Sequence, residues 1–289
     1  MALDKTLEKV KKLRELTGVG FKDCKKAIDE NNGDIEKSIE FLRKKGIAKA
    51  NQKMERVAAD GLVCITEKEN KFSIVEVNSE TDFVAKNNEF IKFVEEISKL
   101  ALINSGKMSD IISSEMQNKK SVEANLVTLI SKIGEKITLR RSDFFGDANC
   151  LNFSYIHSSL QKNVGKIGVL VSLKTTKKKK GLLEFGKQLS MHIAALSPLS
   201  IDKGDLDQNL LKKEKEIITE ELKNSGKDSK IVDKISVGKL NKFIAENTLL
   251  NQEWIMEPKK KVRDILKEVS YKDKIEIKKF VRFKVGEGI

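Results

Sequence analysis

The sequence predicts an α+β protein: an N-terminal three-helix bundle, then two pseudo-repeated β-β-α-β subdomains, the second carrying an inserted helical hairpin. Apolar residues with helical spacing fill residues 1–45, which gives the bundle. The order strand, strand, helix, strand then occurs twice along the chain. A highly charged segment, residues 203–250, interrupts the second unit. The chain of 289 residues is long enough for several domains with well-buried cores.

Three short helices are expected in residues 1–45, because apolar residues recur there every three or four positions. Glycine-containing turns at residues 17–20 and 31–33 separate them, and Asp34 can cap the third helix. Helices joined in this way resemble the ubiquitin-associated (UBA) domain, although the spacing fits a generic three-helix bundle equally well. Residues 46–56 are rich in Ala, Lys and Asn, and we predict a linker there that can itself be helical.

The first β-β-α-β unit is expected in residues 57–145. Apolar strands at 57–66 and 72–77 form a hairpin, and an amphipathic helix begins near Asn88. After a polar connection, which we also expect to be helical, the strand at 136–141 closes the unit.

The second unit is expected in residues 146–202 and 251–289, which also hold the C-terminal segment. Its strands lie at 152–157 and 166–173, joined by a turn over 158–165. A helix and a late closing strand complete the unit, with their apolar residues at Phe185, Leu189, Ile193 and Leu196 and at Val281, Phe283 and Val285.

The insertion at 203–250 has two charged arms with helical spacing and a break at 224–227. An arm of about twenty residues reaches roughly 30 Å as a helix. We expect this helical hairpin to serve as a surface for partners or for self-association. The alternative is a packed pair of core helices.

Composition excludes several classes of protein. No apolar run approaches the ~20 residues of a membrane span, and no secretory signal is recognised, so we expect a cytoplasmic protein. Three scattered cysteines and two histidines predict reduced thiols and no metal site or disulfide framework. No phosphate-binding loop and no catalytic triad motif occurs, so we expect a binding protein without cofactors and not an enzyme. The net charge of +13 comes almost entirely from lysine, which reads bases poorly, so nucleic acid is not the expected primary partner.

An acidic residue followed by a large aromatic, Asp82 and Phe83, stands where the strand ending near Val77 meets the helix beginning near Asn88. Side chains at such junctions tend to be presented rather than buried. A phenylalanine at a strand end is nevertheless more often part of a core, so the pair alone does not establish a binding site.

Ten short motifs in fixed order make almost the whole chain resemble the elongation factor Ts family. They are LRELTGVG (13–20), DCKKA (23–27), NGDIE (32–36), VAADG (57–61), TDFVAKN (81–87), KIGE (132–135), YIH (155–157), IGVLV (167–171), MEP (256–258) and VRFKVGEG (281–288). The resemblance implies a guanine-nucleotide exchange factor of bacterial translation. Its partner is then the GTPase elongation factor Tu, in GDP-bound and nucleotide-free form.

The resemblance also implies roles for individual residues. Those that dislodge Mg²⁺ from the partner are Thr81, Asp82, Phe83 and Val84. Those that bind the partner are Arg14, Phe21, Lys22, Lys25, Ile133, His157, Ile255 and Met256. Two other functions stay open at this stage: a basic ribosome- or RNA-associated binding protein on the same fold, and ubiquitin recognition by the N-terminal bundle.

Overall fold

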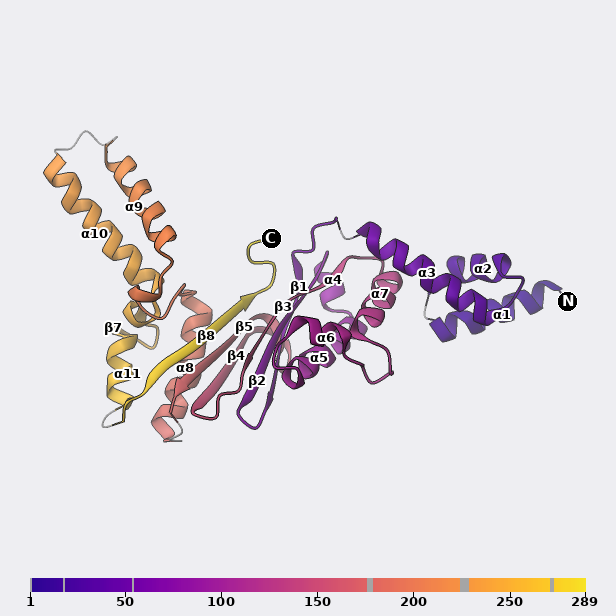
Figure 1. Ribbon diagram of the computed structural model, residues 1–289, viewed down its shortest axis with the longest axis horizontal. Helices are drawn as coiled ribbons and strands as arrows, with labels where there is room; N and C mark the ends of the chain where they lie inside the picture. The colour runs from indigo at the N-terminus through magenta and orange to yellow at the C-terminus, as the bar shows by residue number, and fades with distance from the viewer. Residues whose placement is uncertain (1, 18, 54, 176–178, 224–228, 271–272) are drawn as a thin grey trace.

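The computed structural model describes residues 2–17, 19–53, 55–175, 179–223, 229–270 and 273–289, and its α+β architecture confirms the predicted fold class (Figure 1). The molecule is elongated. A helical bundle lies at one end, antiparallel strands form the centre, and a pair of long helices rises from the other end. Within the described ranges, no helix is both long and apolar enough to cross a membrane.

The N-terminal bundle consists of α1 (Ala2–Thr17), α2 (Phe21–Glu30) and α3 (Ile35–Lys53). Asp34 caps α3 as predicted, because its carboxylate accepts the Lys37 N–H at 3.0 Å. The residues expected as a linker continue α3 through Lys53. This extension reaches the central domain, where a Cβ added to Gly46 would lie 3.3 Å from the Ser131 hydroxyl oxygen.

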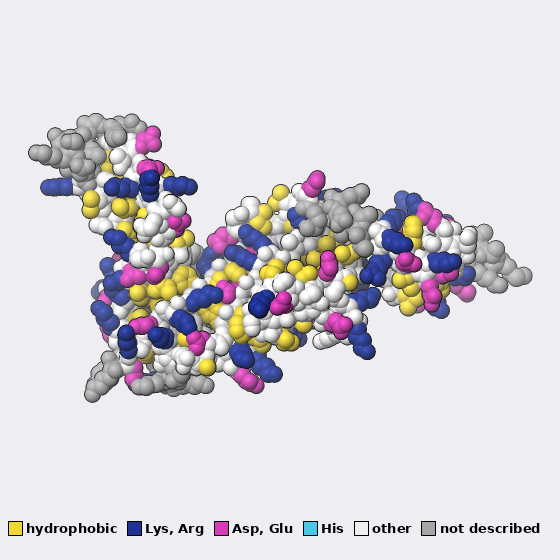
Figure 2. Space-filling view, viewed as in Figure 1, with side chains coloured by type: hydrophobic (Ala, Val, Ile, Leu, Met, Phe, Trp, Pro, Cys, Tyr) yellow, Lys and Arg dark blue, Asp and Glu magenta, His cyan; other side chains and the backbone are white. Residues whose placement is uncertain are grey.

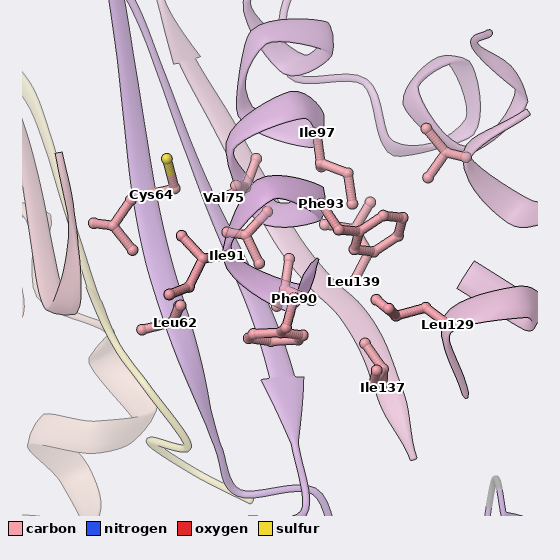
Figure 3. Close-up of a cluster of buried hydrophobic side chains, with 14 of the residues drawn as sticks. Leu62, Cys64, Val75, Phe90, Ile91, Phe93, Ile97, Leu129, Ile137 and Leu139 are labelled. Carbon is pink, nitrogen blue, oxygen red and sulfur yellow. The ribbon is translucent and has the colours of Figure 1, made fainter. Parts of the chain in front are cut away.

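The first half of the central domain is built on β1 (Asp60–Lys68), β2 (Lys71–Ser79) and β3 (Ile137–Phe145), in the antiparallel order β3-β2-β1. Helices α5 (Asn88–Ile103), α6 (Met108–Ser113) and α7 (Val122–Ile133) supply the residues that cover one face. Figure 3 shows how the helical side chains pack on this face; they come from Phe90, Ile91, Phe93 and Ile97 of α5 and Leu129 of α7. The amphipathic spacing of α5 therefore predicted its buried side.

The second half repeats this plan with β4 (Cys150–Gln161), β5 (Val164–Lys174), β8 (Glu276–Lys284) and the covering helix α8 (Lys180–Leu196). Strand β5 lies between β4 and β8. Its odd-numbered residues Val169, Val171 and Leu173 face α8, and α11 (Val262–Ser270) completes that cluster.

The two halves are joined at a corner and packed face to face. The first residues of β5 pair with β1, Val63 with Gly165 and Cys64 with Val164. Further along β5, the side chain of Leu170 points toward the first half. It shares a buried cluster with Ile74 of β2 and with Phe283 of the neighbouring strand β8. Alternation along the strands consequently places α5 and α8 on the two outer faces. The repeated units form one body.

The insertion forms the projecting pair α9 (Gln208–Lys223) and α10 (Ser229–Asn247) (Figure 1). Lys239 and Glu221 pair between the arms at 2.8 Å. The break expected at 224–227 lies outside the described residues. Short elements follow at the base of the arms: α10 leads into β6 (Glu253–Trp254) and β7 (Glu257–Lys261). Cys24, Cys64 and Cys150 are free and buried.

Candidate partner-binding surface

Phe83 lies on a single helical turn, α4 (Asp82–Ala85), between β2 and α5. The next two residues, Val84 and Ala85, are buried in the core of the first half. Phe83 points the other way and is 80% exposed. Two buried anchors thus hold a short turn that presents an aromatic ring to solvent, although a phenylalanine at a strand end is more often part of a core. Exposing a large apolar side chain gives up burial energy, and the ring is available to a partner in this position.

Two carboxylates fasten the segment in front of Phe83 to the loop between α7 and β3. Glu135 accepts both the N–H of Thr81, at 3.0 Å, and its hydroxyl, at 2.8 Å. In the opposite direction, Glu80 accepts the Lys136 N–H at 2.6 Å and pairs with Arg56 at 3.2 Å. Each segment therefore donates to a carboxylate of the other, which fixes the start of α4 from two sides.

Asp82, beside Phe83, is only partly covered and carries its charge at neutral pH. Its carboxylate pairs with Lys86 at 2.7 Å, and the hydrogen bond from Lys86 lowers the pKa of Asp82. Lys166 of β5 adds a smaller effect in the same direction. Asn87 then caps α5 by accepting the N–H groups of Glu89 and Phe90, at 2.8 and 3.3 Å. The turn between β2 and α5 is fixed at both ends.

His157 is exposed on β4, and its Nδ1 lies 3.1 Å from the hydroxyl oxygen of Tyr155. Next to it, a shallow pocket of about 370 Å³ separates the β4–β5 hairpin from the start of β1; its lining residues are Ala59, Asp60, Ser158, Lys166, Ile167, Lys284 and Val285. Ser158, the residue after His157, therefore faces the same pocket as Asp60 at the start of β1.

The four residues expected to bind in the N-terminal bundle are Arg14, Phe21, Lys22 and Lys25. Arg14 lies in the last turn of α1 and the others on α2. All four are exposed, Phe21 to 42%. Their side chains are therefore available to a partner, at the end of the molecule far from α9 and α10 (Figure 1).

The other three expected contact residues are held more firmly. Ile133 ends α7 and packs against the core of the first half, two residues before Glu135. Ile255 and Met256 form the turn between β6 and β7, where Met256 is 45% exposed. The N–H of Ile255 donates to the buried His192 at 3.4 Å. Only Ile133 therefore lies close to the start of α4, while the β6–β7 turn lies in the half that carries α9 and α10.

The positive charge is not gathered into one patch on the face in Figure 2. Lysine and arginine side chains lie over the bundle, the centre and the projecting helices, with acidic side chains among them. Many surface lysines have acidic neighbours, such as Lys279 with Asp143 at 2.7 Å and Lys44 with Glu40 at 2.8 Å. Among the described residues, no cluster of His, Cys, Asp and Glu could hold a metal ion.

Sequence reasoning missed the part that Glu80, Glu135 and Lys136 play in holding α4. Glu135 ends the KIGE motif, but the family resemblance implies no role for its carboxylate. The one signal in the sequence is the glycine at position 134. Gly134 ends α7 with φ +88°, a conformation that favours glycine, and turns the chain sharply before Glu135. Thr81, which donates hydrogen bonds to Glu135, lies 54 positions away in the sequence, so this contact could not be predicted from local spacing.

Comparison with known proteins shows the family to which the chain belongs. The family model described as Elongation factor TS matches residues 80–287. The elongation factor Ts of Bartonella tribocorum is 41% identical over 287 residues, which cover 98% of this chain and 94% of that protein. The elongation factor Ts of Rickettsia felis is 43% identical over 284 residues, covering 97% and 91%. The chain therefore belongs to the elongation factor Ts family and is a translation elongation factor.

Proposed function

We propose that this protein is the guanine-nucleotide exchange factor of elongation factor Tu in a bacterial cytoplasm. It binds the GDP-bound GTPase, promotes release of GDP and remains on the nucleotide-free form until GTP enters. The exposed Phe83 on its doubly fixed turn is the observation that carries this proposal. The protein itself performs no covalent chemistry and needs no cofactor.

A wedge at Phe83 suits the way GTPases hold nucleotide. Mg²⁺ bridges phosphate oxygens and protein ligands, so a small displacement near the metal weakens GDP binding. In the proposed mechanism, Phe83 enters the partner's surface and Asp82 adds negative charge close to the metal, while Thr81 and Val84 hold the turn. Burying one phenylalanine yields about 1.5–3 kcal/mol. Since a tenfold change in rate takes about 1.4 kcal/mol, Phe83 alone accounts for at most about a hundredfold acceleration.

Contacts elsewhere must supply the remaining energy. The exposed residues of the bundle, His157, Ile133 and the β6–β7 turn are the proposed contacts, and they are spread along the molecule. A partner that spans them presses the wedge into place with binding energy from remote surfaces. Because coupling between ligands is reciprocal, nucleotide must weaken the binding of this protein as strongly as this protein weakens that of nucleotide. Incoming GTP then displaces it, and the cycle is reversible.

The test is release of fluorescent GDP from purified elongation factor Tu with Mg²⁺. Phe83→Ala should lose most of the acceleration yet remain as stable as the parent. Ile103→Ala is the matched control, because Ile103 is an apolar residue that is 76% exposed at the end of α5. Acceleration that survives in Phe83→Ala would move the mechanism to the other contacts. A parent protein that binds without changing the release rate would refute exchange activity.

The net charge of +13 favours one alternative, a ribosome- or RNA-associated binding protein on the same fold. Binding of RNA through many lysines falls steeply with salt concentration, because counterions are released from the phosphates. A wedge interface depends much less on salt. Titration of labelled RNA and of labelled elongation factor Tu at increasing salt distinguishes the two functions. Self-association through α9 and α10 is a separate proposal, tested by sedimentation of the protein with and without residues 208–247.

A further inference from the structure

The hairpin between β4 and β5 extends further than the sequence predicted. A turn was expected over 158–165, but β4 runs to Gln161 and β5 begins at Val164, so only two residues form the turn. The second of them, Asn163, has φ +66°. The strands continue past His157, and their tip crosses from the second half of the central domain to the first.

Three contacts fasten this tip to the first half. The side chain of Val164 is fully buried in the core beneath α5. The carbonyl of Asn163 accepts the N–H of Ile65 in β1 at 3.0 Å. The amide of Gln161 donates to the Glu95 carboxylate of α5 at 3.0 Å. The tip is therefore held by one buried apolar side chain, one hydrogen bond between backbone groups and one hydrogen bond between side chains.

The backbone next to His157 has an unusual path that depends on Gly165. Ser158 has φ +51°, and the register of the hairpin shifts between Ser159 and Gln161. A Cβ on Gly165 would lie 2.5 Å from Cγ2 of Ile156, and 2.8 and 3.0 Å from the carbonyl oxygens of His157 and Ser158. Ordinary Cβ atoms do not approach backbone atoms that closely, so a side chain at position 165 must push the His157–Ser158 segment outward.

We propose that the extended β4–β5 hairpin is a positioning element, in which Gly165 and the anchored tip fix His157 relative to Phe83. His157 belongs to the second half and Phe83 to the first, so their spacing depends on how the halves are joined. The tip supplies that connection within a few residues of His157. Its functional consequence rests on the exchange activity proposed above: a partner meets both residues at once only when the tip is seated.

The claim that Gly165 fixes the position of His157 can be tested on the protein alone, without its partner. The chain has two histidines, exposed His157 and buried His192, so the imidazole NMR signals of the folded protein can be assigned by single substitution. Gly165→Ala should move the His157 signals and leave those of His192 unchanged. Gly181→Ala is the matched control, since a Cβ there has no neighbour within 4 Å, and it should move neither. Unchanged His157 signals in folded Gly165→Ala would overturn the proposal.

The functional part is tested by a double-variant cycle in the GDP-release assay. Gly165→Ala should lower the apparent second-order rate constant by about tenfold, the scale of losing one strong interface contact, and His157→Ala by a similar factor. The two changes together should cost no more than His157→Ala alone, because Gly165 acts through His157. Additive losses in a stably folded protein would contradict a positioning role. A wild-type protein without exchange activity would refute the proposed function and leave the NMR result standing.

Gln161→Ala provides a second variant in case Gly165→Ala does not fold. It removes only the surface contact with Glu95, so the fold should persist. We expect a smaller displacement of the His157 signals and a loss of about twofold to threefold in exchange, in line with one hydrogen bond. This loss should be absent in the His157→Ala background. A full loss of exchange with unmoved His157 signals would instead show that the tip touches the partner itself, and would overturn the positioning role.

Discussion

The carboxylate of Glu135 holds Thr81 through both its backbone N–H and its hydroxyl, at 3.0 and 2.8 Å. Thr81 precedes the one-turn helix that presents Phe83. The orientation of an exposed aromatic ring thus depends on a charged residue in another loop. Hydrogen bonds to ionised groups contribute about 1.5–3 kcal/mol, enough to favour one orientation strongly.

Glu135→Ala should reduce the maximal rate of GDP release about tenfold, corresponding to ~1.4 kcal/mol, while binding to the partner changes little. The reason is that the turn loses its preferred orientation without losing Phe83. Stopped-flow measurement over a range of protein concentrations separates the maximal rate of GDP release from the protein concentration that gives half of it. Glu67→Ala, which alters an exposed carboxylate at the end of β1, should match the parent. A change confined to affinity would show that Glu135 does not act through the wedge.

The exposed cation Lys25 on α2 should behave in the opposite way. We expect this lysine to hold the partner equally well before and during GDP release, so that holding the wedge in place falls to the other proposed contacts. Lys25→Ala should then raise the concentration for half-maximal exchange and leave the maximal rate intact. The effect should shrink as salt increases, because exposed charges are screened. Lys37→Ala, on α3 of the same bundle, serves as the control. A loss of maximal rate would place α2 in the exchange step itself.

Glu76 connects the first half to the C-terminal segment. Its buried carboxylate binds Arg140 at 3.0 Å, Arg141 at 2.6 Å and the N–H of Gly286 at 2.9 Å. Burial alone raises the pKa of Glu76, but the hydrogen bonds from Gly286, Asn78 and Arg141 outweigh it and lower the pKa below its ordinary 4.5. Glu76→Gln should lower the free energy of unfolding by about 3 kcal/mol at neutral pH, since it leaves two arginines without their shared anion.

The pH dependence of Glu76 has a definite sign. A carboxylate with a lowered pKa in the folded state stabilises the protein fully above about pH 4.5, and this stabilisation disappears as the pH falls through the folded-state pKa. The free energy of unfolding, measured with urea at pH 7 and at pH 3.5, should therefore differ less between the two pH values for Glu76→Gln than for the parent. An equal difference in both proteins would mean that Glu76 does not contribute to acid unfolding.

His192 makes stability depend on pH in a higher range. Burial lowers the pKa of His192 from 6.5 to about 4, although a hydrogen bond with Gln252, at 3.0 Å, opposes the shift. The unfolded chain takes up a proton near pH 6.5 and the folded chain does not, so stability should fall as the pH drops from 6.5 to 4 and stay level above that range. The loss is at most about 3 kcal/mol.

Trp254 reports on this effect, because its ring stacks on His192 with centroids 5.1 Å apart and is the only tryptophan in the sequence. Urea titrations followed by its fluorescence, at several pH values between 4 and 8, give the free energy of unfolding. His192→Asn should lower stability at pH 8 but flatten the slope between pH 6.5 and 4. A slope that survives the substitution would assign it to other groups.

Periodicity in the sequence predicted those elements whose contacts are local. The apolar positions of α5 and the alternation of β5 and β8 gave the correct elements and their buried sides. In α8, Phe185, Leu189 and Ile193 are buried as predicted, but Leu196 at the end of the helix is 41% exposed. Patterns of this kind depend on the geometry of one helix or strand. The exposure of Phe83 was not fixed in this way, because a junction between a strand and a helix is compatible with either burial or exposure, and the neighbouring Val84 and Ala85 are buried.

Features that depend on contacts between distant segments could not be predicted. Val164 falls within the stretch expected to be a turn, yet it begins β5 and its side chain completes the core of the first half. The turn expected over 158–165 is mostly strand, because the β1 backbone extends the pairing beyond His157. Likewise, nothing around Glu135 in the sequence points to Thr81. The first two arrangements depend on how the two halves are joined, and the third on a contact between two loops of the first half.

The burial of all three cysteines makes the protein suited to site-specific labelling. Burial raises the pKa of the Cys24 thiol and raises that of Cys64 to about 12, so these thiols stay protonated and hidden at neutral pH. Cys150 is buried as well. A cysteine introduced at an exposed position on α9 or α2 should therefore react with a maleimide dye while the native thiols remain unmodified. A donor and an acceptor placed in this way would follow the distance between the two ends of the molecule during exchange, without prior removal of any native cysteine.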